Sequence, residues 1–141
     1  MVKRILLVDD DPDDVDMFQE ALNEIDADAQ FITVPNGKKA LDKVEELDHL
    51  GIIFLDINMP VMGGLECLSE LKKKDTVKHV PVLMYSTSSN KSDSQKAKQL
   101  GALCFVIKPD EYNNLKKIIR TVLTHLETGQ IDTLCDAVHQ I

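Results

Sequence analysis

The chain has 141 residues, 43% of them hydrophobic and 28% charged, and its formal net charge at pH 7 is −8. That length suits one domain with a sizeable buried core. The acidic balance argues against nucleic acid as the main partner, because phosphate binding requires a basic patch. No apolar run approaches the roughly 20 residues of a membrane span, and the run behind Met1 is too short for a signal peptide. We therefore expect a cytoplasmic protein without nucleic-acid or membrane partners.

The cysteines and histidines show no pattern of a cross-linked or metal-bound framework. The cysteines are far apart and odd in number, which favours reduced thiols over a disulfide framework or a zinc site; they are Cys67, Cys104 and Cys135. The histidines lack the spacing of metal ligands, so we expect surface or satisfied core positions for His49, His79, His125 and His139.

The first predicted strand, residues 2–9, is apolar until it ends in carboxylates. The run Ile5-Leu6-Leu7-Val8 is typical of a strand that is buried on both faces. Asp9, Asp10 and Asp11 follow this run. Adjacent carboxylates repel one another unless a cation or a lysine lies among them. We therefore expect a positively charged group close to this cluster.

A helix is predicted directly after these acids. Asp11 is a suitable N-cap, and Pro12 suits the first helical position. Asp13 and Asp14 then lie in the first turn, where negative charge favours the helix dipole. The apolar residues of this helix recur at helical spacing, as Val15, Phe18, Leu22 and Ile25.

Strands and helices continue to alternate along the chain. We expect strands at residues 31–34, 52–55, 80–85 and 103–107. Asn36 is a candidate cap for the second helix, and the fourth and fifth helices are expected at about 92–100, ended by Gly101, and 111–126. The apolar faces of the second and third helices are Ala40, Leu41, Val44, Leu47 and Leu65, Leu68, Leu71. This alternation predicts a parallel sheet with helices on both faces and ligands at the carboxyl ends of the strands.

The last predicted helix and the C-terminal segment carry more apolar residues than a one-sided surface helix needs. The helix has a wide stripe, which favours a dimer face over simple burial on the sheet: Leu115, Ile118, Ile119, Val122, Leu123 and Leu126. Residues 130–141 also show helical spacing, with Ile131, Leu134, Val138 and Ile141. A short helix that packs on its own domain or on a second subunit is expected there.

The carboxyl ends of the predicted strands bring acids, hydroxyls and a lysine to one rim of the sheet. The first strand delivers the acids 9–11, the third Asp56, the fourth Ser86 with Thr87, and the fifth Lys108. Carboxylates with one lysine suit a hard divalent cation such as Mg²⁺, which prefers oxygen ligands. One carboxylate could then act as a nucleophile toward a phosphoryl group whose oxygens the cations stabilise.

Other functions of the acidic cluster have less support. Asp9, Asp11, Asp13 and Glu20 occupy positions of a calcium-binding EF-hand loop, but Asp14 stands where that loop requires glycine. The chain also lacks a Walker A sequence, a G-x-G-x-x-G and a G-x-S-x-G, which removes most support for nucleotide binding and serine hydrolysis.

Several motifs together resemble a response regulator receiver domain of two-component signalling, over about residues 3–126. They are Val8-Asp9-Asp10-Asp11-Pro12, Leu55-Asp56-Ile57-Asn58-Met59-Pro60 with Gly63-Gly64, Ser86-Thr87 and Lys108-Pro109. They occur in the order and spacing of that family. The run from Asp9 to Val15 and the Ser-Thr pair are most similar to the single-domain, phytochrome-associated subgroup.

The resemblance implies a role for each residue at the rim. Asp56 would accept a phosphoryl group from a histidine of a sensor kinase. Asp9 and Asp10 would organise Mg²⁺, with Asp56 and the backbone carbonyl of Asn58 as the other protein ligands, while Asp11 would cap a helix. Ser86 would donate to the phosphoryl group, and Lys108 would pair with it, and with the acids before phosphorylation. The peptide bond between Lys108 and Pro109 would be cis.

The resemblance also implies a conformational switch. On phosphorylation Ser86 would move inward and Phe105 would fill the space that it leaves, although an ordinary core role for Phe105 is equally open. The face formed by the helices expected at about 92–100 and 111–126 and the strand expected at 103–107 would then change. Thr87 stands where many relatives have alanine and could narrow access to the site, while Asn58 and Ser88 flank it.

We therefore expect an α/β receiver domain over residues 1–128, with a doubly wound five-stranded parallel sheet of flavodoxin-like order 2-1-3-4-5 and five helices, and a short helical extension over 129–141. Its predicted function is that of a stand-alone response regulator, not an enzyme beyond Mg²⁺-dependent self-phosphorylation and autodephosphorylation. Partners would be a sensor histidine kinase or a histidine phosphotransfer protein. A homodimer through the face of residues 92–100, 103–107 and 111–126 is a further option. The alternatives are a phosphate sink or relay intermediate, and a haloacid-dehalogenase-like phosphatase using Asp9 and Asp11, which leaves Asp56 unexplained.

Overall fold

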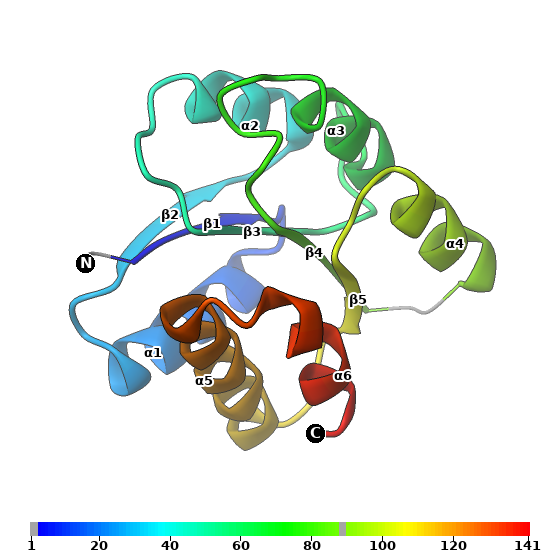
Figure 1. The fold of residues 1–141 in the computed structure, drawn as a ribbon. Coiled ribbons are helices and arrows are strands. Elements are labelled where there is room, and N and C mark those ends of the chain that lie inside the picture. Colours follow the sequence, from blue (N-terminus) through cyan, green and yellow to red (C-terminus); the bar gives the residue numbers. More distant parts are fainter. Residues whose placement is uncertain (1–2, 88–89) are drawn as a thin grey trace.

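A five-stranded parallel sheet forms the middle layer of the computed structural model, which describes residues 3–87 and 90–141. The spatial order is β2-β1-β3-β4-β5, as predicted. The last strand, β5, therefore forms one edge of the sheet (Figure 1). In chain order the strands are β1 (Arg4–Val8), β2 (Gln30–Val34), β3 (Ile52–Leu55), β4 (Val82–Ser86) and β5 (Cys104–Ile107).

Helices cover both faces of this sheet (Figure 1). One face carries α1 (Pro12–Ile25), α5 (Tyr112–Thr128) and, after a 3-10 turn η1 (Ile131–Thr133), α6 (Leu134–His139). The other carries α2 (Gly37–Val44), α3 (Gly64–Leu71) and α4 (Lys91–Gln99). The predicted helices all form, and α6 raises the number of α-helices among the described residues to six.

The strands are apolar because both of their faces are buried. Along β1, Ile5 and Leu7 face the core beneath α1 and α5, while Leu6 and Val8 face the core beneath α2, α3 and α4. All of β3 and β4 is buried in the same way. This explains why these strands lack the alternation of polar and apolar residues that a half-exposed strand shows.

The local signals for helix ends behave as predicted. The side chain of Asp11 accepts from the backbone N–H of Asp13 at 2.9 Å, and Pro12 takes the first helical position. Asn36 accepts from the N–H of Lys39 at 2.9 Å. Gly101 follows α4 with a φ of +102°, a conformation that favours glycine.

Some boundaries differ from the prediction. Residue 2, the expected start of the first strand, lies outside the described residues, and so does Ser88. β4 begins at Val82 and not at residue 80 because Pro81 lacks an N–H, and its carbonyl accepts from Ile53 at 3.0 Å instead. Within the described residues, no helix is long and apolar enough to cross a membrane.

The apolar stripe of α5 is covered by the chain itself, so the dimer face expected there is wrong. Its residues Leu115, Ile118, Ile119, Val122 and Leu123 are each at most 5% exposed, packed in the core with β5 and α1. Leu134 and Val138 of α6 belong to the same core, at 0% and 4% exposure. The C-terminal extension therefore packs on its own domain.

The expectation of three reduced thiols is also wrong. Cys104 of β5 and Cys135 of α6 form a disulfide, with their Cα atoms 5.3 Å apart. The two positions are 31 residues apart in the sequence and come together only because α6 folds back onto β5. Cys67 is the remaining cysteine, a free and buried thiol.

Candidate functional site

Two acids and a lysine meet at the carboxyl ends of the strands. Asp9 follows β1, Asp56 follows β3, and Lys108 follows β5. The Lys108 ammonium lies 2.8 Å from Asp9 Oδ2 and 3.3 Å from Asp56 Oδ2. Both acids are buried, with only 2% and 6% of their surface exposed. The rim predicted from the sequence is thus assembled from strands far apart in the chain.

Asp14, which was expected only to favour the helix dipole, is a further member of this cluster. It lies in the first turn of α1, and its Oδ2 accepts from Lys108 Nζ at 2.8 Å. Three carboxylates therefore share one ammonium. The position of Asp14 could have been found by asking which residues of the first helical turn overhang the end of β1.

Burial and crowding shape the protonation of this cluster. Burial raises the pKa of Asp9, and the neighbouring negative charge of Asp56 adds to that rise, against the lowering effect of Lys108. Burial likewise raises the pKa of Asp56, although Lys108 and the backbone amides of Asn58 and Ile57 oppose it. Burial alone would lower the pKa of Lys108, but the surrounding carboxylates raise it overall, so the lysine stays charged. The single positive charge of Lys108 does not balance the negative charges of Asp9, Asp14 and Asp56.

The acids at this rim carry more negative charge than Lys108 balances, which indicates room for a further cation. Oδ1 of Asp9 accepts from the N–H of Asp11 at 2.9 Å, which fixes the carboxylate. Among the described residues no donor is aligned with the buried Oδ2, although Lys108 lies close to it. Asp9, Asp10 and Asp56 can bring carboxylate oxygens within 4.8 Å of one another, and Asp10 is exposed. An oxygen-only donor set of this charge fits a hard divalent cation.

The loop behind Asp56 is held by a close backbone approach at Gly64. The N–H of Gly64 donates to the carbonyl of Ile57 at 2.7 Å, and the N–H of Asp56 donates to Val8 at 3.0 Å. A Cβ at position 64 would lie 2.1 Å from the carbonyl oxygen of Asp56, so only glycine fits. These contacts fix the backbone that carries Asp56 and the exposed Asn58.

The predicted switch residues lie at the end of β4, directly after it, and on β5. Ser86 is buried at 1% exposure, while Thr87 is exposed and Phe105 is half-buried. Met84 pairs with Phe105, and Ser86 pairs with Ile107, so Ser86 and Phe105 point to the same face of the sheet. That face is covered by α2, α3 and α4, and Phe105 packs against its core.

Tyr85 lies on the opposite face and was not anticipated as a neighbour of the site. Its ring centroid is 5.5 Å from Lys108 Nζ, close enough for a cation–π contact. The ring also meets Phe54 and Phe18 edge-on. The aromatic ring of Tyr85 therefore packs against the ammonium group of Lys108.

The peptide bond between Lys108 and Pro109 is trans, so the cis bond expected there is wrong. The trans form is the default for bonds that precede proline, by about 0.5–1 kcal/mol. Lys108 is fixed instead through its own N–H, which donates to the carbonyl of Ser86 at 2.8 Å and continues the pairing of β5 with β4.

The fold and the rim together define a doubly wound α/β domain with an acidic site at its strand ends. The family model of the response regulator receiver domain matches residues 5–120. The chain belongs to this family, whose members include phosphoacceptor response regulators.

Individual relatives are similar over different shares of their length. A probable cyclic di-GMP phosphodiesterase of Vibrio cholerae is 31% identical over 156 residues, covering 95% of this chain but 34% of the relative. The chain thus spans about a third of that protein. Response regulator Rcp1 of Synechocystis is 29% identical over 126 residues, covering 85% of this chain and 86% of the relative.

Solved structures agree with this assignment. The phosphorylated cyanobacterial phytochrome response regulator RcpA superposes with a TM-score of 0.82 at 28% identity, covering 92% of this chain and 96% of the other. The Mn²⁺-bound form of Rcp1 gives a TM-score of 0.75 at 29% identity, covering 86% and 92%.

Proposed function

We propose that this protein is a response regulator that accepts a phosphoryl group on Asp56. The observation that carries the proposal is the contact of Lys108 Nζ with Asp56 Oδ2 at 3.3 Å, beside Asp9, whose Oδ2 pairs with the same ammonium at 2.8 Å. A buried carboxylate with a cation on either side can act as a nucleophile toward phosphorus, since the developing charge on the phosphoryl oxygens is stabilised.

The step itself needs little from the protein beyond orientation. An oxygen of Asp56 attacks the phosphorus of a phosphohistidine, the P–N bond breaks, and the released imidazole nitrogen takes up a proton. Lys108 pairs with an oxygen of the transferred group, and the Ser86 hydroxyl donates to another. Asn58 and Thr87, both exposed, flank the entrance and influence how fast water removes the phosphoryl group.

Asp9, Asp10, Asp56 and the backbone carbonyl of Asn58 are the residues that would hold Mg²⁺. The oxygen donor set and its excess of negative charge over the single lysine support this assignment, as does the Mn²⁺ ion bound by the relative Rcp1. The ion supplies positive charge that neutralises phosphoryl oxygens during transfer.

We propose that phosphorylation changes the face formed by α4, β5 and α5. Ser86 and Phe105 support this because they occupy neighbouring strands on one face of the sheet. If Ser86 moves toward the phosphoryl group, Phe105 can turn into the vacated space. The neighbouring surface would then differ between the two states and could bind a partner or a second copy of the chain.

The proposal also covers the extent of the domain, its compartment and its phosphoryl donor. Residues 1–128 would form the receiver unit and 129–141 an extension of it. The protein would act in the cytoplasm, receive phosphoryl groups from a sensor histidine kinase or a histidine phosphotransfer protein, and carry out no chemistry beyond its own phosphorylation and dephosphorylation. The likeness to RcpA and Rcp1 favours a kinase of the phytochrome type.

Phosphorylation with acetyl phosphate and Mg²⁺ tests the proposed acceptor. Intact-mass measurement should show one added phosphoryl group on the wild-type protein and none on Asp56→Asn. Asp11→Asn is a matched control, because asparagine preserves the helix cap and Asp11 lies outside the lysine cluster. Phosphorylation of Asp9 in the Asp56→Asn variant would contradict the proposal and favour a phosphatase-like nucleophile.

A lifetime measurement then separates a switch from a phosphate sink or relay. A switch should keep its phosphoryl group long enough to change partner binding. Rapid loss, or efficient return to a histidine phosphotransfer protein, would assign the sink or relay role instead.

A further inference from the structure

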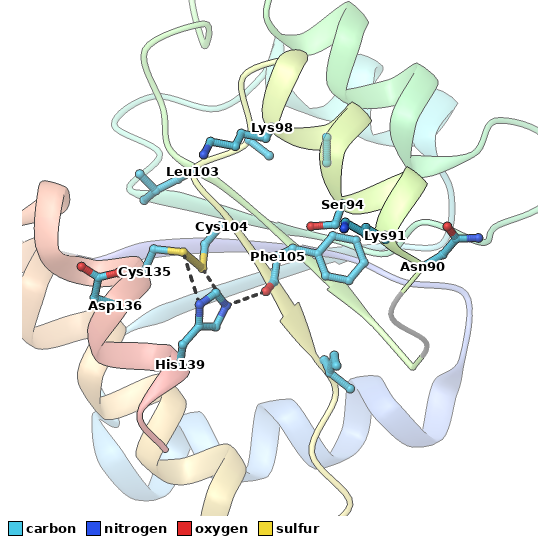
Figure 2. A pocket seen from close by; sticks show the side chains of 13 residues that line it. Asn90, Lys91, Ser94, Lys98, Leu103, Cys104, Phe105, Cys135, Asp136 and His139 are labelled. Carbon is cyan, nitrogen blue, oxygen red and sulfur yellow. Dashed lines mark hydrogen bonds between the residues drawn. A yellow bond between two sulfur atoms is a disulfide. The ribbon is translucent and has the colours of Figure 1, made fainter.

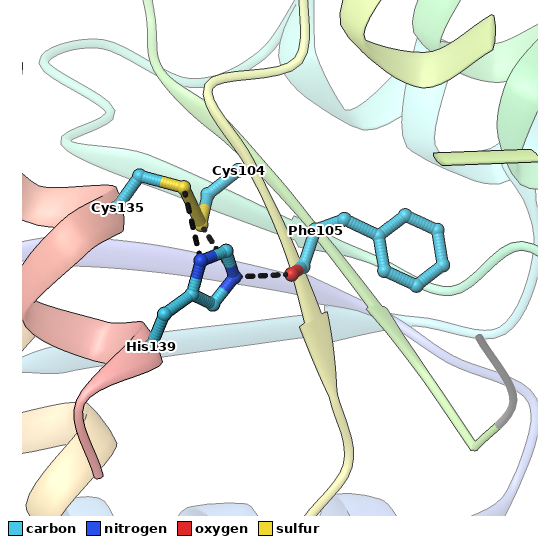
Figure 3. The surroundings of a disulfide bond; sticks show 4 residues. All are labelled: Cys104, Phe105, Cys135 and His139. Carbon is cyan, nitrogen blue, oxygen red and sulfur yellow. Dashed lines mark hydrogen bonds between the residues drawn. A yellow bond between two sulfur atoms is a disulfide. The ribbon is translucent and has the colours of Figure 1, made fainter. Parts of the chain in front are cut away.

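The disulfide between Cys104 and Cys135 lies beside His139, which can act as a base toward a cysteine thiol when the bond is reduced (Figure 3). His139 Nε2 is 2.9 Å from the carbonyl oxygen of Phe105 and 3.6 Å from Cys104 Sγ. His139 Nδ1 is 3.9 Å from Cys135 Sγ. A carbonyl can only accept, so Nε2 carries the hydrogen and Nδ1 of the neutral ring is free to accept a proton from the Cys135 side.

The two sulfur atoms differ in accessibility. Cys104 is buried at 5% exposure on β5, whereas Cys135 is half-buried on α6. Both residues line an open groove that runs between α4 and α6 across β5 (Figure 2). A small reagent in that groove meets Cys135 first, so Cys135 is the sulfur to be attacked or oxidised, and Cys104 is its partner.

Cys67 provides a contrast within the same chain. It is completely buried, and burial raises the pKa of its thiol to about 12. A thiol of that kind remains protonated and inert at neutral pH. The chain therefore contains a cysteine pair with one partly exposed member, Cys135, next to a base, and a third cysteine that is fully buried.

We propose that Cys104 and Cys135 form a reversible thiol–disulfide site, with His139 as the base that activates Cys135, and that oxidation fastens α6 to β5. The redox chemistry stands apart from phosphoryl transfer, but its physiological relevance rests on the proposed cytoplasmic function. In a reducing compartment a disulfide is usually transient and serves catalysis or redox sensing.

The oxidant would be a peroxide. The Cys135 thiol gives its proton to His139 Nδ1, and the thiolate attacks one peroxide oxygen. The O–O bond breaks, and hydroxide leaves as water after taking a proton, which yields a sulfenic acid on Cys135. The Cys104 sulfur then attacks the Cys135 sulfur, water leaves with the thiol proton, and the disulfide forms. In total, two thiols are oxidised and one hydrogen peroxide becomes two waters. A dithiol reverses the change by attack on Cys135, with Cys104 as the leaving thiolate beside Nε2–H of His139.

The disulfide lies next to Phe105, a proposed switch residue, so its oxidation state can affect that region of β5. Cys104 directly precedes Phe105, and His139 bonds to the backbone of Phe105. The cross-link spans 31 residues and should make α6 open less often by about 30- to 1000-fold, because it restricts the chain when α6 detaches. The oxidation state would thereby set how firmly α6 covers β5 and α5.

Thiol labelling of the full-length folded protein tests the redox site. After treatment with a dithiol, alkylation should modify Cys104 and Cys135, and limited hydrogen peroxide should restore the bond with loss of two hydrogen atoms in mass. His139→Gln, whose amide can still donate to Phe105, should slow reoxidation about 10-fold because the thiolate fraction falls. Cys67→Ala should reoxidise like the wild-type protein.

Several results would overturn the proposal. One is that dithiols reduce the disulfide only after the protein has been unfolded. Another is that His139→Gln reoxidises as fast as the wild-type protein. A third is that the amides of α6 exchange hydrogen at the same rate in the oxidised and the reduced protein. Stoichiometric Zn²⁺ binding that protects the reduced pair from peroxide would instead assign the cluster to metal binding. Cys135→Ser should still be phosphorylated on Asp56, so failure of the redox site and failure of the proposed phosphoacceptor are distinguishable.

Discussion

Lys108 is closer to Asp14 than to Asp56, at 2.8 Å against 3.3 Å between the ammonium nitrogen and the nearest carboxylate oxygen. The lysine that we assign to the phosphoryl group is therefore partly held by a carboxylate of α1. The proposed transfer would require Lys108 to shift its pairing, and we expect Asp14 to compete with the incoming phosphoryl oxygens for the same charge.

Asp14→Asn should accelerate phosphorylation of Asp56 by acetyl phosphate. The variant replaces a charge-assisted hydrogen bond by a weaker neutral one, which frees Lys108 for the transition state. We expect an increase of about 5-fold in the rate, measured by intact mass against time, because the two kinds of hydrogen bond differ by about 1 kcal/mol.

Asp13→Asn is the matched control for this variant. Asp13 lies in the same helical turn, is exposed, and is not among the carboxylates that contact Lys108. Its substitution should leave the rate unchanged. If Asp14→Asn slowed the reaction as much as Lys108→Ala does, Asp14 would position the lysine rather than compete for it.

Asp9→Asn should stabilise the metal-free protein at neutral pH. Burial raises the pKa of Asp9 in the folded protein above its ordinary value of 3.8. The folded state therefore binds more protons than the unfolded state, and stability is lost as the pH rises from that ordinary value through the raised pKa. Asparagine removes the charge and keeps the acceptor for the N–H of Asp11.

Thermal unfolding in the presence of a chelator measures this effect. We expect a Tm that is a few degrees higher for Asp9→Asn at neutral pH, the shift that about 1 kcal/mol produces in a chain of this size, and a smaller gain near pH 4. Added Mg²⁺ should stabilise the wild-type protein more than the variant. A lower Tm for Asp9→Asn at neutral pH would show that the ion pair with Lys108 outweighs the cost of burial.

The sequence predicts the elements of this fold well because local signals mark them. The third strand was predicted at residues 52–55, where it lies, because it is apolar throughout and ends on the carboxylate of Asp56. The caps Asp11 and Asn36 were found because a short polar side chain before a helical pattern satisfies free amides. The acids and the lysine of the rim followed from their common place after parallel strands.

The remaining features depend on contacts between distant segments. Nothing local to Cys104 or Cys135 indicates that α6 returns to β5, so the disulfide could not be predicted. The stripe of α5 looked the same whether α6 or a second subunit covered it. Asp14 was missed because its contact with Lys108 depends on how α1 starts relative to the end of β1, and helix propensity does not reveal that position.

Gly64→Ala should destabilise the protein and weaken phosphorylation together. The added methyl group would overlap the carbonyl oxygen of Asp56, and that backbone cannot yield without moving Asp56. We expect a loss of about 3 kcal/mol in the free energy of unfolding, the upper end of the range typical of overpacking. Urea unfolding measures the loss. Gly63→Ala is the control, because its Cβ would meet only the carbonyl of Ile57, at 3.3 Å, and a cost below about 1 kcal/mol is expected.

Leu134→Ala tests whether α6 belongs to the core of its own domain. Leu134 is fully buried against the α5 face, so truncation leaves a cavity and should lower the free energy of unfolding by about 2–4 kcal/mol. Ile141→Ala, at a residue 44% exposed, should change it by less than about 0.5 kcal/mol. Urea unfolding of the oxidised protein at several concentrations measures both. If the α5 stripe were instead a dimer face, Leu134→Ala would leave the unfolding of the monomer unchanged, and the midpoint of the wild-type protein would rise with concentration, because dissociation would then be part of unfolding.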